Sequence, residues 1–110
     1  MKLFLDDERA PPSPQYQVAY QGWQAVVYLV RNNFAIEELS LDHDLGDGVP
    51  TGYDVAAWLE KVVLTQGVQP PKILRVHSAN PVGRARILQA FQSIARYCEA
   101  NGMEIPQVFG

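Results

Sequence analysis

The chain is poor in several features that would set it apart from an ordinary intracellular globular protein. It has a single cysteine, Cys98, so no internal disulfide can form and a reducing compartment is expected. No apolar run is long enough to span a membrane, and the start of the chain does not predict a signal peptide. The net charge of -3 gives no general attraction to a duplex nucleic-acid backbone. We therefore expect a cytoplasmic protein without membrane or duplex nucleic-acid partners.

The amino-acid composition is typical of a single globular domain. Hydrophobic residues make up 47% and charged residues 19% of the 110 positions, which suits a single domain over residues 1–110 with a buried core. Apolar strand-like runs alternate with helical patterns. The expected strands cover residues 2–5, 17–20, 37–42 and 72–77, with a further short strand possible in the tail 105–109, and the expected helices start near Trp23, Thr51 and Asn80. This order predicts a mostly parallel sheet with helices packed on it.

Local signals mark the ends of these elements. Three prolines in residues 8–15 exclude a helix there. Thr51 with Asp54 resembles a capping box, and Asn80 followed by Pro81 is a good helix start. The expected buried stripes of the three helices are Trp23, Val26, Val27, Val30 and Phe34, then Val55, Leu59, Val62 and Val63, and finally Ile87, Leu88, Phe91, Ile94, Ala95 and Cys98.

Three of the expected strands end in chemically reactive side chains. The first runs into Asp6-Asp7, the third into Asp42-His43-Asp44, and the fourth into His77-Ser78. In open parallel sheets, ligands bind outside the carboxyl ends of the strands. The sequence therefore predicts one shared site that contains both histidines of the chain.

The carboxylates of this site suggest a metal. Asp6, Asp7 and Asp42 could together bind a hard divalent ion such as Mg²⁺, which prefers oxygen ligands. The alternative is that Asp7 or Glu8 caps the proline-rich loop. We expect no organic cofactor.

The histidines suggest proton transfer. The carboxylates of Asp42 and Asp44 flank His43 and could fix its tautomer, as a general acid or base requires. His43 and His77 could then act as acid and base across one phosphorus centre. The alternatives are that His43 packs against the sheet in a polar loop and that His77 is a buried histidine satisfied by a backbone carbonyl.

The start of the last helix predicts an anion site. Its free N–H groups point toward the strand ends, Gly83 allows close approach of the backbone, and Arg84 can donate two hydrogen bonds to phosphate. Ser78 and Asn80 complete the predicted phosphate-binding set. The alternative is an ordinary capped helix with a solvated arginine.

These motifs resemble a known family. The acidic pair after the first strand, the acidic end of the third strand and Ser78-Ala79 after the fourth look like a response-regulator receiver domain, although a lysine at the end of a fifth strand is absent. A narrower group, the cyclic-phosphate processing receiver-like domains, is more similar. The similarity rests on four segments, Leu5 to Arg9, Ser40 to Gly46, Thr51 to Asp54 and His77 to Gly83.

The resemblance implies both a fold and an activity. The fold would be a three-layer flavodoxin-like or receiver-like α/β domain with a central sheet of about four to five strands and a reduced first helix. The activity would be hydrolysis at a cyclic phosphate, such as the 2′,3′-cyclic end of an RNA or nucleotide, with His43, His77, Asp42 and Asp44 as catalytic residues. Two alternatives are a signalling module phosphorylated on Asp42 and a binder of phosphate ligands without catalysis.

Overall fold

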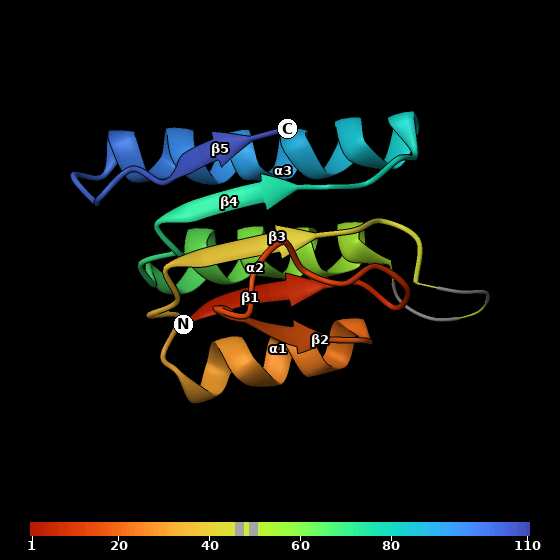
Figure 1. The fold of residues 1–110 in the computed structure, drawn as a ribbon. Helices are drawn as coiled ribbons and strands as arrows, with labels where there is room; N and C mark the ends of the chain where they lie inside the picture. Colours follow the sequence, from red (N-terminus) through yellow and green to blue (C-terminus); the bar gives the residue numbers. More distant parts are fainter. Residues whose placement is uncertain (46–47, 49–50) are drawn as a thin grey trace.

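The computed structural model describes residues 1–45, 48 and 51–110, and the predicted loop residues Gly46, Asp47 and Pro50 lie outside them. The described part contains five strands and three helices (Figure 1). In chain order they are β1 (Lys2–Leu5), β2 (Tyr16–Ala19), α1 (Gly22–Arg31), β3 (Glu38–Leu41), α2 (Gly52–Gln66), β4 (Ile73–Val76), α3 (Pro81–Ala100) and β5 (Gln107–Phe109).

All five strands are parallel, in the order β2-β1-β3-β4-β5. This is the flavodoxin-like order, in which the chain leaves in opposite directions from β1 and β3. The predicted α/β receiver-like fold is therefore confirmed. The connection from β1 to β2 is a loop without a helix, because its prolines cannot continue one.

The three helices pack on one face of the sheet. Leu3, Leu39 and Leu74 point to this face and share one core with buried residues of α1, α2 and α3. The connections from β2 to β3, β3 to β4 and β4 to β5 all progress in the same direction, so right-handed crossovers place their helices on the same side. Figure 1 shows α2 and α3 behind the strands and the loop after β1 in front of them. Of the three layers expected, the third is thus the loop 6–15, not a helix.

The strand register brings the predicted site residues to one edge. Leu5 of β1 pairs with Leu41 of β3, and Leu41 pairs with Val76 of β4. The residues that follow these strand ends therefore emerge side by side. This edge carries the candidate site.

The predicted core face of α1 is wrong. The structure buries Gly22, Ala25 and Leu29, whereas Trp23 is 61% exposed and Val30 is 52% exposed. Two apolar stripes run along this helix, and the one with small residues lets the helix backbone approach the sheet more closely. Periodicity alone does not distinguish the two stripes.

The other two helices agree with the sequence in their ends and buried faces. Thr51 and Asp54 form the predicted capping box, and α2 ends at Gly67, whose φ of 68° is left-handed. The side chain of Asn80 caps α3, and Cys98 is buried. Among the described residues, no helix combines the length and hydrophobicity needed to cross a bilayer.

Candidate functional site

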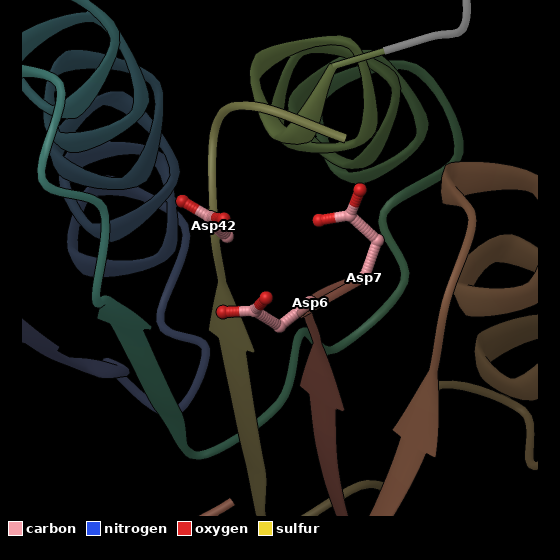
Figure 2. A group of neighbouring side chains, drawn as sticks. All are labelled: Asp6, Asp7 and Asp42. Atoms are coloured by element: carbon pink, nitrogen blue, oxygen red, sulfur yellow. The ribbon is translucent and has the colours of Figure 1, made fainter. Parts of the chain in front are cut away.

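Three carboxylates gather at the carboxyl edge of the sheet (Figure 2). Asp6 and Asp7 follow β1, Asp42 follows β3, and one oxygen of each lies within 4.8 Å of the others. Asp6 is only 1% exposed and Asp42 is 8% exposed. The structure therefore brings together the three side chains predicted to hold a metal.

The electrostatics of this cluster fit a divalent cation. Burial, and then the negative charge of Asp6, raise the pKa of the Asp42 carboxyl. Hydrogen bonds from the His43 N–H, at 2.8 Å, and from the Ser78 hydroxyl act in the opposite direction. A hard cation such as Mg²⁺ would offset the repulsion, and three carboxylate donors are ligands of the type that it prefers.

Asp6 is held by several donors. Its Oδ1 accepts hydrogen bonds from the backbone N–H groups of Glu8, at 2.8 Å, and Arg9, at 2.9 Å. Its Oδ2 lies 3.0 Å from Nε2 of His77 and 3.8 Å from Nε of Arg9. These contacts fix the carboxylate orientation and draw the loop after β1 toward β4.

His77 uses both of its ring nitrogens. Burial lowers the pKa of His77, so the ring is neutral near pH 7. The Nε2–H group then donates to Asp6, and Nδ1 accepts from the Ser40 hydroxyl at 2.7 Å. The ring also stacks on Phe4, with centroids 4.2 Å apart. His77 therefore lies on the face of the sheet that the loop 6–15 covers.

His43 lies in a different environment. Its Nδ1 is 2.8 Å from Oδ1 of Asp44, and this hydrogen bond is the main cause that lowers the pKa of Asp44. The Nδ2 group of Asn80 is 3.4 Å from the other oxygen of Asp44. Among the described residues, Nε2 of His43 has no hydrogen-bond partner. An imidazole oriented through Nδ1 with a free Nε2 is the arrangement of a general base.

Gly83 makes room for this imidazole. A Cβ atom on Gly83 would lie 2.2 Å from Cγ of the His43 ring. The ring thus packs against the first turn of α3, on the helix face of the sheet. The N–H of Gly83 donates to Oδ1 of Asn80 at 3.0 Å and caps the helix.

The remaining predicted phosphate ligands are placed as follows. The Ser78 hydroxyl is buried and accepts from the N–H of Asn80 at 3.1 Å. The side chain of Arg84 is exposed, and within the described residues it forms no hydrogen bond or ion pair with a member of the site. Phosphate binding by Arg84 stays a prediction.

The site residues form two groups that meet at Asp42. Asp6, Asp7 and His77 lie on one side, and His43, Asp44 and the start of α3 lie on the other. The two rings face opposite sides of the sheet, and no contact joins them in the described part of the chain. The expected pairing of both histidines across one pocket thus has no support in the geometry.

Two residues of the site were not predicted from the sequence. Ser40 binds Nδ1 of His77, and Arg9 donates from Nη1 to the backbone oxygen of His77 at 2.7 Å. The signal for Ser40 was a hydroxyl between two leucines, Leu39 and Leu41, in a strand. Arg9 gave no comparable signal, because its contacts depend on the path of the loop.

Comparison with known proteins points to a receiver-type family. A family model described as cyclic-phosphate processing receiver domain matches residues 1–93. Neither a curated protein nor a solved structure matches the chain. The matched segment includes every element from β1 to most of α3, and thus the complete edge described above.

Proposed function

This chain belongs to the cyclic-phosphate processing receiver domain family, and we propose that it is a phosphoesterase that opens a cyclic phosphodiester. The substrate would be a 2′,3′-cyclic phosphate at the end of a nucleotide or an RNA. The observation that carries the proposal is that Asp42 joins an acidic cluster to an oriented imidazole at one edge of the sheet.

His43 is the general base of this reaction. Its Nε2 takes a proton from water as the water oxygen attacks phosphorus, one ring P–O bond breaks, and the released ribose oxygen takes up a proton from solvent. Asp44 orients the imidazole and stabilises its protonated form, and Asn80 in turn orients Asp44. A positioned base of this kind contributes about 10²- to 10⁴-fold to the rate.

The acidic cluster is the proposed metal site beside the phosphate of the substrate. Asp6, Asp7 and Asp42 would hold Mg²⁺, which when bound supplies positive charge beside the phosphoryl oxygens. His77 is a positioning residue, because both of its nitrogens are engaged and its Nε2–H group orients Asp6. Ser78, Asn80 and Arg84 border the same edge and are proposed phosphate contacts.

Replacement of His43 tests the proposal. His43→Ala is expected to lower kcat on a nucleoside 2′,3′-cyclic phosphate by about 10²- to 10⁴-fold, because water then attacks without a base. Arg31→Ala, at the exposed end of α1, is the control and should keep the activity of the wild type. An unchanged kcat in His43→Ala would remove this residue from the mechanism.

A second function is favoured by one observation at Asp42. A phosphoacceptor of the receiver type needs an aspartate beside two acidic neighbours and a hydroxyl, and Asp42 has Asp6, Asp7 and Ser78 near it. Residues 105–110, which include β5, contain no lysine of the kind that a receiver has at the end of its fifth strand. This function predicts labelling of Asp42 by a small phosphodonor with Mg²⁺, and loss of the label in Asp42→Asn. Saturable binding of a cyclic nucleotide without turnover would instead indicate a non-catalytic binding domain.

A further inference from the structure

The face of the sheet opposite the helices contains a pocket of about 470 Å³. Its floor comes from Phe4 and Ser40, in the middle of β1 and β3, and Tyr16 and Arg75 contribute walls from β2 and β4. Three residues of the loop 6–15, Arg9, Ala10 and Pro12, also line the pocket. The size is in the range of small-molecule sites.

We propose that this pocket binds the nucleoside part of the substrate, base and ribose, while the cyclic phosphate lies at the carboxyl edge of the sheet. The inference rests on the proposed phosphoesterase function and names the class of substrate. It separates a nucleoside cyclic phosphate from a cyclic phosphate without a base.

The pocket adjoins the acidic cluster, because two of its lining residues contact Asp6. His77 lines the pocket and donates to Asp6 through Nε2. Arg9 also lines the pocket, and its Nε lies 3.8 Å from Oδ2 of Asp6. A ligand in the pocket would therefore lie next to the two residues that contact Asp6, on the side of the proposed metal and phosphate site.

The walls of the pocket are held rigidly. Nε of Arg75 is 3.4 Å from the buried carboxylate of Glu38, and its guanidinium lies 4.6 Å from the centre of the Phe109 ring. The hydroxyl of Tyr16 donates to the same carboxylate, and the ring of Tyr16 packs edge-on against Phe4. A pre-organised wall loses little entropy when a ligand binds.

The chemistry of the walls suits a nucleobase. Proteins bind unpaired bases by stacking on aromatic rings and on arginine planes, and by donating hydrogen bonds to base acceptors. Arg75 and Arg9 are cationic donors, and the acids that contact the lining are already paired: Glu38 with Arg75 and Tyr16, and Asp6 with Arg9 and His77. The lining therefore favours an electron-rich planar ligand.

The inference is tested by measuring substrate preference before and after a substitution that fills the pocket. The kcat/KM of the wild type is compared for a nucleoside 2′,3′-cyclic phosphate and for glycerol 1,2-cyclic phosphate, which has the same phosphate ring without base or ribose. We expect the nucleoside compound to be preferred by about tenfold or more. Ala10→Trp places a large side chain in the pocket from an exposed loop position and should reduce this preference toward unity. Gln15→Trp, in the same loop but outside the pocket, should keep it.

The outcomes separate this inference from the function on which it rests. Equal kcat/KM for both compounds, or an unchanged preference in Ala10→Trp, would overturn the pocket and leave the phosphoesterase intact. Turnover of neither compound would overturn the phosphoesterase and the pocket with it. A dinucleotide with a 3′-terminal cyclic phosphate, compared with the mononucleotide, shows whether the ligand is an RNA end or a free nucleotide, and either one satisfies the proposal.

Discussion

Substitution of Gly83 by alanine, which adds one carbon atom, should lower the activity strongly and the stability only slightly. The Cβ of an alanine would lie 2.2 to 2.7 Å from three atoms of the His43 ring, far inside van der Waals contact. The Gly83 backbone belongs to the first turn of α3 and is fixed by the Asn80 cap. The imidazole must therefore move, and its hydrogen bond to Asp44 must break or tilt.

The expected magnitudes differ for rate and stability. Loss of the oriented base in Gly83→Ala should lower kcat on a nucleoside 2′,3′-cyclic phosphate by about 10²- to 10⁴-fold. Alanine in a helix is about 0.5–1 kcal/mol better than glycine, whereas overpacking costs about 1–3 kcal/mol. The net destabilisation of about 1 kcal/mol should lower the Tm by only about 4 °C.

Two measurements on the same sample decide this prediction. The rate is measured on the cyclic nucleotide, and the imidazole N–H that binds Asp44 is followed by proton NMR. Val82→Ala is the matched control, because this side chain is in the same turn, is 70% exposed and should change neither signal. Wild-type activity in Gly83→Ala would show that the position of His43 does not matter for the reaction.

Three further predictions address other parts of the structure. Mg²⁺ should raise the Tm of the wild type but not that of Asp42→Asn, since the substitution removes one of the clustered carboxylates; an equal rise in both would exclude a metal on Asp42. Burial and Glu38 raise the pKa of Tyr16 from 10.0 to about 12, so the folded state holds this proton while the unfolded state loses it, and stability should fall as the pH rises from 10 to 12. Denaturant unfolding should show a smaller fall in Tyr16→Phe, and identical pH profiles would refute the shift. Ser40→Ala leaves Nδ1 of His77 without its donor and should cost about 1–3 kcal/mol in the same assay, whereas an unchanged free energy of unfolding would mean that water replaces the hydroxyl.

Much of the fold follows from local chemistry that is visible in the sequence. Asn80-Pro81 and Gly67 mark helix ends because of backbone geometry, which does not depend on tertiary packing. The buried face of α1 was not predictable in this way. Both stripes of that helix have the right period, and the choice of Leu29 over Trp23 depends on how closely the helix approaches the sheet.

The candidate site, like the fold, could be predicted only in part from the sequence. Strand ends in a parallel sheet share one edge, so the meeting of Asp6 and Asp42 could be predicted without coordinates. The directions of the two imidazoles continue the strand alternation, with His43 on the side of Leu41 and His77 on the side of Arg75. Both residues lie beyond the last strand residues, where the sequence does not require the alternation to continue. The part played by Ser40 depends on that direction, since it requires the ring of His77 to turn away from the helices.

The central claim is tested most directly by phosphorus NMR of the wild-type protein with a nucleoside 2′,3′-cyclic phosphate and Mg²⁺. The proposed function predicts that the cyclic phosphate resonance is replaced by that of a monoester, at a rate that falls strongly in His43→Ala. A cyclic resonance that persists unchanged with the wild-type protein would contradict it.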